Sequence, residues 1–206
     1  MQAKQQIIPP QYTVKDYYKW GDNPRMELIN GYLYMMSPAP KPSHQEVIVK
    51  ILRQIDTYLE GKKCKVYGAP IDVCFAKHSI VQPDVTIICD PKKTENNFRC
   101  EGAPDMIAEV LSPSTKSKDE TEKLALYERF GVREYWIVDP IKYTVKVFLL
   151  RDGEYMLPPV KYSMQDRVKV DVLDDCYVDL NIVFSGLVAE PTRKRSRPRR
   201  MTNPND

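Results

Sequence analysis

The chain has 206 residues, of which 42% are hydrophobic and 29% are charged, and its formal net charge is +3 at pH 7. This length and composition predict a single soluble globular domain. No apolar run approaches the roughly 18 residues that a membrane span requires. The first residues, MQAKQQIIPPQ, also lack the apolar centre of a signal peptide. These features argue against a membrane or exported protein, and we expect a cytoplasmic one.

The cysteines and histidines argue against a zinc protein. The five cysteines, at positions 64, 74, 89, 100 and 176, include no CxxC pair, and histidine occurs only at positions 44 and 78. A structural zinc site takes four such ligands, usually in closely spaced pairs. An odd number of cysteines is typical of free thiols in a reducing cytosol, which is the state that we expect here.

The net charge is unevenly distributed along the chain. Residues 193–200, RKRSRPRR, carry six positive charges and no negative ones, so removing them from the total of +3 leaves −3 on the rest. From residue 190 onward Pro, Arg and Ser dominate and no apolar residue recurs, which predicts disorder. We therefore expect an N-terminal extension at 1–11, a folded domain at 12–189 and a basic tail at 190–206.

Caps and turns predict the first elements of the domain. Thr13 and Asp16 have the spacing of a capping box, which starts a short helix that ends before Pro24. Asn30-Gly31 lies between two apolar-rich runs and is a strong signal for a β-hairpin. Glu27 lies on the first strand of this hairpin.

A longer helix and several strands follow. Ser43 and Glu46 form a second capping box, which opens a helix with one apolar face that Gly61 ends. The pattern then changes to strands at residues 64–67, 71–75 and 81–89, and the last of these carries Pro83-Asp84 near its start. Residues 90–103 are polar and predict a loop.

Residues 104–140 predict a strand, a turn, a helix and a second strand, and the rest of the domain is arranged around this unit. The strands are the apolar runs 105–111 and 132–138. Ser117 and Glu120 have capping-box spacing at the start of the helix, which should run to about Phe130 and close with Gly131 in the left-handed conformation.

The remaining strands complete the expected fold. Asp152-Gly153 predicts a second hairpin between strands at 143–150 and 154–157, and short strands are expected at 168–172 and 177–180. The order of helices and strands predicts one α/β (α+β) domain with a mixed β-sheet flanked by helices.

Two charged residues of the central unit are predicted to face inward. Because strand residues alternate between faces, Glu109 shares its face with Ile107 and Leu111. Lys123 begins the helical stripe that continues through Leu126, Tyr127 and Phe130, and such a stripe packs on a sheet. An acid and a base that both face the core indicate a functional site.

Three acids lie on predicted strands: Glu27, Asp84 and Glu109. Each taken alone is most simply a solvated residue at a strand end. Together with an inward lysine, however, they fit the hydrolysis of a phosphodiester bond. That reaction uses a divalent cation held by carboxylates, which neutralises the phosphate and acidifies a water molecule. A protein cation near the developing charge helps further.

These residues resemble a known nuclease pattern. Pro83-Asp84, followed by Glu109-Val110-Leu111 on a neighbouring strand, resembles the PD-(D/E)xK nuclease superfamily. The chain is similar in particular to the "putative restriction endonuclease" family of small bacterial proteins, which is especially abundant in cyanobacteria. The matching segments include MELINGYLYMMSP, SHQ, QPDVTII, AEVLSPST and DETEKLALYERFGVREYWIVDP. The resemblance covers about residues 12–185, and it implies a restriction-endonuclease-like fold.

One departure from the superfamily pattern concerns the lysine. The motif places it at position 111, where this chain has Leu111, but in families of this type it can come from the following helix. Lys123 fits that relocation. The resemblance then implies that Asp84 and Glu109 bind Mg²⁺ (or Mn²⁺) with the Val110 carbonyl. It implies that Glu27 supports the metal, directly or through water. Lys123 would orient the attacking water or stabilise the phosphate of a DNA substrate.

Several alternatives remain open at this stage. Asp119 lies one helical turn before Lys123, and it either joins the site or simply pairs with the lysine. His44, at a helix start that favours anions, either contacts a phosphate of the substrate or packs locally. The Met35-Met36 pair, Tyr127, Tyr135 and Trp136 are expected to pack the core.

A homodimer is expected only by analogy with enzymes that cut both strands. The whole domain could also be a catalytically silent module of the same fold that binds nucleic acid or protein, or it could hydrolyse another phosphate ester.

Overall fold

A computed structural model describes residues 11–21, 25–36 and 40–187. The basic tail and nearly all of the expected N-terminal extension lie outside these residues. Among the helices of the described residues, none is both long enough and apolar enough to cross a membrane.

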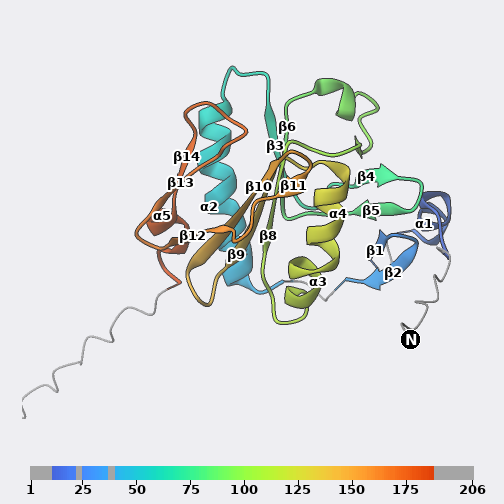
Figure 1. Cartoon of the computed structure of the whole chain (residues 1–206), viewed down its shortest axis with the longest axis horizontal. Coiled ribbons are helices and arrows are strands. Elements are labelled where there is room, and N and C mark those ends of the chain that lie inside the picture. Colours follow the sequence, from blue (N-terminus) through green and yellow to red (C-terminus); the bar gives the residue numbers. More distant parts are fainter. Residues whose placement is uncertain (1–10, 22–24, 37–39, 188–206) are drawn as a thin grey trace, which may run out of the picture.

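Two β-sheets and three layers organise the domain (Figure 1). The larger sheet has the order β11-β10-β9-β8-β6-β3, with β12 also paired to β10. Its strands are β3 (Lys65–Gly68), β6 (Val85–Ile88), β8 (Met106–Val110), β9 (Glu134–Asp139), β10 (Thr144–Arg151), β11 (Glu154–Tyr155) and β12 (Val160–Ser163). The pairing of β8 with β9 is parallel and the others are antiparallel, so the expected mixed sheet is confirmed.

The smaller sheet has the order β2-β1-β5-β4-β7. Its strands are β1 (Met26–Ile29), β2 (Tyr32–Met35), β4 (Val73–Ala76), β5 (Ser79–Val81) and β7 (Cys100–Glu101), and a separate hairpin pairs β13 (Arg167–Lys169) with β14 (Tyr177–Asp179). The helices are α1 (Val14–Trp20), α2 (Pro42–Leu59), α3 (Lys116–Glu120), α4 (Glu122–Phe130) and α5 (Leu180–Phe184), with a 3-10 turn η1 (Pro91–Thr94).

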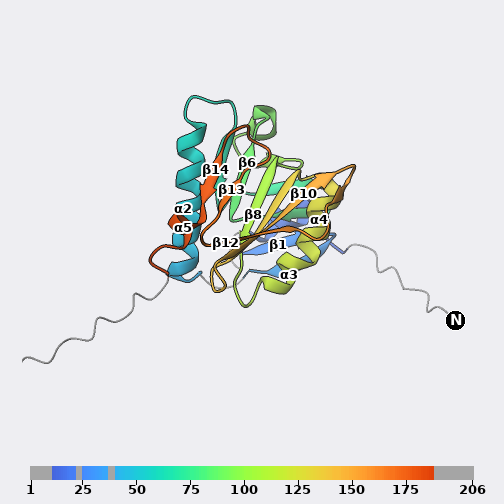
Figure 2. The ribbon, with the colours of Figure 1, turned by 60° about the vertical axis from the view of Figure 1, so that its left-hand side comes forward.

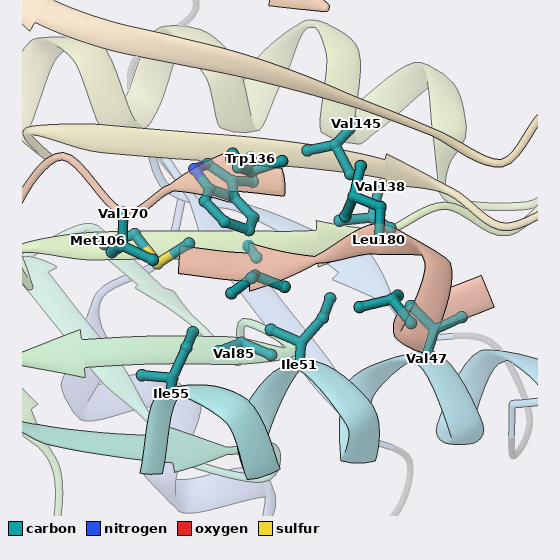
Figure 3. Packing of buried hydrophobic residues seen from close by; sticks show 14 of the residues in the cluster. Val47, Ile51, Ile55, Val85, Met106, Trp136, Val138, Val145, Val170 and Leu180 are labelled. Carbon is teal, nitrogen blue, oxygen red and sulfur yellow. The ribbon is translucent and has the colours of Figure 1, made fainter. Parts of the chain in front are cut away.

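The larger sheet is covered on both faces (Figure 2). Helix α2 lies on one face, where Ile51 and Ile55 pack against Val85, Met106 and Trp136 in one hydrophobic cluster (Figure 3). Helices α3 and α4 lie on the other face. Because side chains alternate along a strand, β8 sends Met106, Ala108 and Val110 into the α2 cluster and Ile107 into the cluster around α4.

Local sequence signals explain several boundaries. The capping box of Thr13 and Asp16 is confirmed, since each residue accepts a hydrogen bond from the backbone N–H of the other. Both expected hairpins are also confirmed. Asn30-Gly31 has φ values of 51° and 83°, and Asp152-Gly153 has 52° and 88°. Positive φ at both central residues is what a two-residue hairpin turn requires.

Two of the three expected capping boxes are wrong. Helix α2 begins at Pro42 with Lys41 as its cap, because proline is pre-organised for the first helical position and draws the start ahead of Ser43. Helix α3 begins at Lys116 after Thr115, so Ser117 lies inside it. In neither helix does the N-cap side chain form a capping hydrogen bond.

The expected single helix at 117–130 is two helices, separated by Thr121. The Thr121 backbone has φ −128° and ψ −80°, and its hydroxyl donates a hydrogen bond of 2.7 Å to the Ser117 carbonyl. That carbonyl would otherwise accept the Thr121 N–H in a continuous helix. Competition of this kind between side chain and backbone is typical of threonine.

The expected strand at 81–89 is likewise two strands. Strand β5 belongs to the smaller sheet and β6 to the larger one, with Gln82-Pro83-Asp84 between them. Proline has no N–H to donate to a strand ladder, so the pairing breaks there.

Two smaller expectations are also wrong. The 90–103 segment contains η1 and β7, and Met35 is 64% exposed on its outer strand.

The expectation of free thiols is wrong for two of the five cysteines. Cys64 and Cys89 form a disulfide, whereas Cys74, Cys100 and Cys176 are free and buried. The physical reason is the register of β3 with β6. Lys65 pairs with Ile88, so the residues just beyond this pair, Cys64 and Cys89, lie opposite each other. Directly opposite residues of antiparallel strands have adjacent side chains on one face.

Candidate active site

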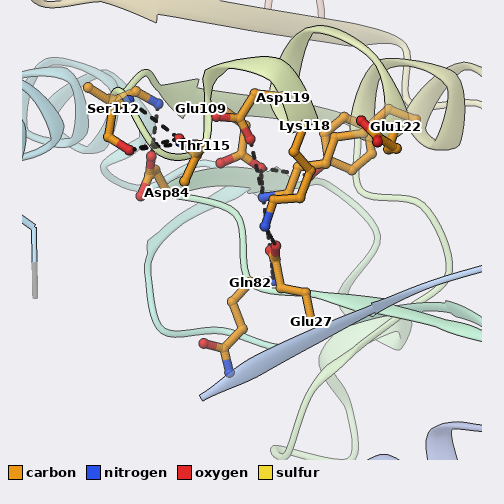
Figure 4. Close-up of polar contacts among 12 residues, drawn as sticks. Glu27, Gln82, Asp84, Glu109, Ser112, Thr115, Lys118, Asp119 and Glu122 are labelled. Atoms are coloured by element: carbon orange, nitrogen blue, oxygen red, sulfur yellow. Dashed lines mark hydrogen bonds and ion pairs between the residues drawn. The ribbon is translucent and has the colours of Figure 1, made fainter. Parts of the chain in front are cut away.

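Carboxylates and lysines from both sheets and from the α3–α4 pair converge at one place (Figure 4). Glu27 comes from β1, Asp84 from the junction before β6, and Glu109 from the end of β8. Asp119 lies on α3, and Lys123 lies in the first turn of α4. The four expected residues Glu27, Asp84, Glu109 and Lys123 are therefore brought into one region.

Lys123 is the centre of this cluster. Its ammonium lies 2.8 Å from Glu27 Oε1, 2.9 Å from Glu109 Oε1 and 3.7 Å from Asp119 Oδ1. Its side chain is only 5% exposed. Burial alone would lower the pKa of this lysine, but the Glu109, Glu27 and Asp119 carboxylates outweigh it and raise the pKa well above its usual value. The lysine is therefore a buried cation, held by the carboxylates around it.

Glu109 has a perturbed pKa. Burial, reinforced by the charges of Asp119, Asp84 and Glu27, raises the pKa of its carboxyl to about 8, against the opposing effect of Lys123. Its Oε1 also accepts a hydrogen bond of 2.7 Å from the Tyr127 hydroxyl. Sequence reasoning placed Tyr127 only in the core, although its position one turn after Lys123 could have indicated this contact.

Glu27 is the acid on which two lysines meet. Burial would raise the pKa of its carboxyl, but Lys123 and Lys118 outweigh that effect and lower it. Lys118 lies 2.6 Å from Oε2, and Lys123 lies near Oε1, which also accepts the Gln82 backbone N–H at 3.2 Å. Lys118 was missed by sequence reasoning because it is not on the apolar stripe of the expected single helix.

Asp84 and His44 form the other end of the cluster. Asp84 Oδ2 accepts the Val110 N–H at 2.8 Å, and His44 Nε2 lies 2.7 Å from the Val110 carbonyl oxygen and 3.4 Å from Asp84 Oδ2. The His44 Nδ1 atom is buried and has no hydrogen-bond partner within the described part of the chain. These contacts favour the local packing role that was open for His44.

Asp119 is buried with one oxygen unsatisfied. Its side chain is 2% exposed, and no donor in the described residues hydrogen-bonds to Oδ1. Burial raises the pKa of its carboxyl despite the nearby Lys123. A buried carboxylate oxygen that lacks a donor is costly, and here the Lys123 ammonium at 3.7 Å offsets part of that cost. Asp119 is therefore part of the cluster as well as a partner of Lys123.

The charges of the cluster fit a divalent cation. When all four acids are ionised, Glu27, Asp84, Glu109 and Asp119 exceed Lys118 and Lys123 by two negative charges. Carboxylate and carbonyl oxygens are also the ligands that Mg²⁺ prefers. Within the described ranges, no group of three or more His, Cys, Asp and Glu side chains is arranged to hold a metal ion. Any cation would therefore rely on two carboxylates, a backbone carbonyl and water.

The fold and this cluster together define a class of protein. A mixed sheet with helices on both faces, an acid just before β6, a second acid on the neighbouring strand β8, and a buried lysine describe a restriction-endonuclease-like domain. The family follows from the whole sequence. The chain belongs to the Uma2 family, described as "Putative restriction endonuclease", whose model matches residues 14–181.

Two cyanobacterial proteins and one solved structure are similar to this chain. The chain is 22% identical over 183 residues to the uncharacterized protein slr1290 of Synechocystis sp., covering 86% of this chain and 94% of that protein. It is 26% identical over 125 residues to sll1609 of the same organism, covering 59% and 70%. A crystal structure from Anabaena variabilis, described as "a putative nuclease belonging to DUF820", superimposes with a TM-score of 0.70 at 19% identity, covering 85% of this chain and 99% of that one. This last likeness shows the shared fold.

Proposed function

We propose that the protein is a magnesium-dependent endonuclease that hydrolyses DNA phosphodiester bonds. The observation that carries the proposal is the buried Lys123 ammonium, 2.9 Å from Glu109 and 2.8 Å from Glu27. A lysine supplied by a helix would then take the place that the superfamily motif gives to position 111, in a chain whose family is described as "Putative restriction endonuclease". Perturbed acids and a buried base at one place are typical of catalytic sites.

Asp84, Glu109 and the Val110 carbonyl are the groups that would hold Mg²⁺ or Mn²⁺. With all four acids ionised, the cluster carries two more negative than positive charges, and this supports a cation at this place. Such a cation supplies charge neutralisation to the phosphate and a more acidic water. Glu27 would support the metal through water rather than bind it directly, because both of its oxygens are already paired with lysine ammonium groups.

Lys123 would orient the attacking water or stabilise the negative charge that develops on the phosphate. A fixed cation in a site that excludes water does so effectively, because it needs no reorganisation during the reaction. Glu27 and Glu109 keep the ammonium in one position from two sides. Tyr127 would fix the orientation of the Glu109 carboxyl.

The direct test is incubation of supercoiled DNA with the purified protein, with and without Mg²⁺ or Mn²⁺. We expect nicked or linear products only with the metal, and none from Glu109→Gln.

Metal binding is measured separately by thermal unfolding. Because crowded carboxylates repel each other without a cation, Mn²⁺ should raise the Tm of the wild type and raise that of Glu109→Gln much less. Equal Tm shifts in the two proteins would refute this metal site.

The second candidate is a catalytically silent module that binds nucleic acid or protein. It predicts DNA binding or partner binding without any cleavage in either metal. The presence of all four expected residues in one cluster favours the enzyme over this alternative.

Two further properties belong to the proposal. Enzymes that cut both strands often act as dimers, so we expect a homodimer on DNA, which light scattering with and without a duplex would detect. A nuclease of this kind would meet its DNA in the cytoplasm, and fractionation of cells that produce the protein would test that location.

A further inference from the structure

Two lysines share one buried carboxylate, but they differ in how many of their N–H donors are already used. Lys123 faces Glu27 at 2.8 Å and Glu109 at 2.9 Å, with Asp119 at 3.7 Å. An ammonium group has three donors. Two N–H donors of Lys123 are therefore engaged, and the third points toward Asp119. Lys123 cannot donate to a new acceptor without releasing one of these carboxylates.

Lys118 is in a different position. Within the described residues its ammonium makes one ion pair, with Glu27 Oε2 at 2.6 Å, and its side chain is 14% exposed against 5% for Lys123. Among the described residues, one of its three donors is used and two remain. The ring of Tyr34 has its centroid 5.6 Å from the ammonium, and such a ring offers no competing carboxylate.

The two lysines lie on opposite oxygens of Glu27, and this places Lys118 beside the catalytic cluster. Glu27 is itself anchored, because β1 pairs with both β2 and β5 and the Gln82 N–H donates to Oε1. The break at Thr121 separates Lys118 on α3 from Lys123 on α4, which allows both to reach the same carboxylate (Figure 4). Lys118 is therefore a fixed cation with unused donors at the more open side of the cluster.

We propose that Lys118 is a substrate-contacting residue, which donates to a DNA phosphate oxygen while it stays paired with Glu27. This inference rests on the proposed nuclease function and adds a contact that the superfamily motif does not contain. The ligand class is the phosphodiester backbone, so the contact strengthens binding without reading sequence. Lys123 then serves the chemical step, and Lys118 holds the phosphate.

Equilibrium DNA binding tests the assignment, with Ca²⁺ in place of Mg²⁺ and a labelled duplex titrated at several salt concentrations. Lys118→Met should raise the Kd about tenfold, as expected for one lost charge-assisted hydrogen bond. It should also reduce the slope of log Kd against log salt by about one. The change should be the same for duplexes of unrelated sequence.

Three further variants make the test specific. Lys118→Arg keeps a cation with spare donors, so its Kd and salt slope should stay near those of the wild type. Lys118→Gln removes the charge but can still donate to Glu27, and it covers the case in which Lys118→Met folds poorly. Lys146→Met is the matched control. Lys146 is also a partly exposed lysine in an ion pair, 2.8 Å from Glu120, and lies outside the cluster. It should bind DNA like the wild type.

The outcomes separate this inference from the proposed function. A wild type that cuts DNA, together with a folded Lys118→Met or Lys118→Gln variant that leaves both Kd and salt slope unchanged, overturns the Lys118 contact alone. Slower cleavage with unchanged Kd and slope also overturns it, because Lys118 would then act only through Glu27. A wild type that neither binds nor cuts DNA overturns the proposed function and this contact with it.

Discussion

At the scale of single residues, Lys123 keeps its charge in the interior because three carboxyl groups surround it. Removal of one partner of such a buried group is costly, since the remaining charges lose their compensation. Burial, with the neighbouring acids, raises the pKa of Glu109 to about 8, whereas two lysines outweigh burial at Glu27 and lower its pKa. Each acid therefore behaves according to its neighbours rather than its residue type.

Lys123→Met tests this arrangement, since methionine keeps most of the volume without the charge. We expect the free energy of unfolding to fall by about 3–5 kcal/mol at pH 7. The loss should be smaller at pH 5, because the buried carboxyl groups left without Lys123 take up protons more readily there. The folded variant should still gain Tm with Mn²⁺ but cleave DNA at least a hundredfold more slowly, the scale of one lost transition-state donor. Urea unfolding at both pH values and a cleavage assay measure this, and cleavage at the wild-type rate would end the catalytic assignment.

Tyr127→Phe isolates the hydroxyl that donates to Glu109 Oε1 at 2.7 Å. Loss of this buried hydrogen bond should cost about 1–2 kcal/mol and slow cleavage severalfold, because the Glu109 carboxyl is less fixed. Tyr155→Phe is the control, since the Tyr155 hydroxyl donates to the Val132 carbonyl at 3.0 Å, away from the cluster. It should lose similar stability and no activity. If both variants cleave equally well, Tyr127 contributes to stability alone.

At the scale of elements, the site depends on places where regular structure stops. The break between β5 and β6 leaves Asp84 at the junction of the two sheets, and the break at Thr121 orients α3 and α4 separately. In the larger sheet, β9 is fixed by another buried acid. Glu134 accepts hydrogen bonds from the Trp136 indole at 2.7 Å and from the Val172 N–H at 2.9 Å. The second of these attaches the segment before β14 to the sheet.

Glu134 predicts a pH dependence of stability. Burial outweighs these hydrogen bonds and raises the pKa of its carboxyl from 4.5 to about 7. Between these values the folded protein retains a proton that the unfolded chain releases, so stability falls as the pH rises from about 4.5 to 7 and is constant above. The contribution is roughly 3 kcal/mol. The Glu134→Gln variant should be less stable, because the amide NH₂ of glutamine would face an N–H donor. Its free energy of unfolding should not show the fall with pH that Glu134 causes. Urea unfolding from pH 4.5 to 8 compares the two proteins, and parallel curves would contradict the assignment.

At the scale of the whole molecule, three layers place the cluster between the two sheets and the α3–α4 pair. The described residues form the domain, while the six positive charges of residues 193–200 lie outside them. A basic segment attached to a mildly acidic domain could bind DNA phosphates independently of the DNA sequence. The alternative is a segment that only increases solubility.

Truncation after Glu190 tests the contribution of the basic tail. If all six charges contact phosphates, the salt slope of DNA binding should fall by up to about 5, and the affinity should fall with it. The Tm shift with Mn²⁺ should remain, because the metal groups lie in the domain. Binding titrations at several salt concentrations measure both quantities. An unchanged affinity and slope would leave the tail without a role in DNA binding.

Local rules determined much of this protein from its sequence alone. The turns at Asn30-Gly31 and Asp152-Gly153 were predictable because they depend on the conformational freedom of adjacent residues. The inward direction of Glu109 and Lys123 followed from strand alternation and helix periodicity, which act over a few residues. The resemblance of motifs added the grouping of Asp84 with Glu109.

The tertiary structure alone decided which distant residues meet. Lys118 and Glu27 are 91 positions apart, and Tyr127 and Glu109 are 18 apart, yet each pair is in direct contact. The Cys64–Cys89 disulfide likewise depends on the β3–β6 register. Such contacts depend on how sheets and helices pack, and no short-range pattern of residues specifies that. This is why the sequence indicated a lysine and its acids, while only the folded chain showed that two lysines share one carboxylate.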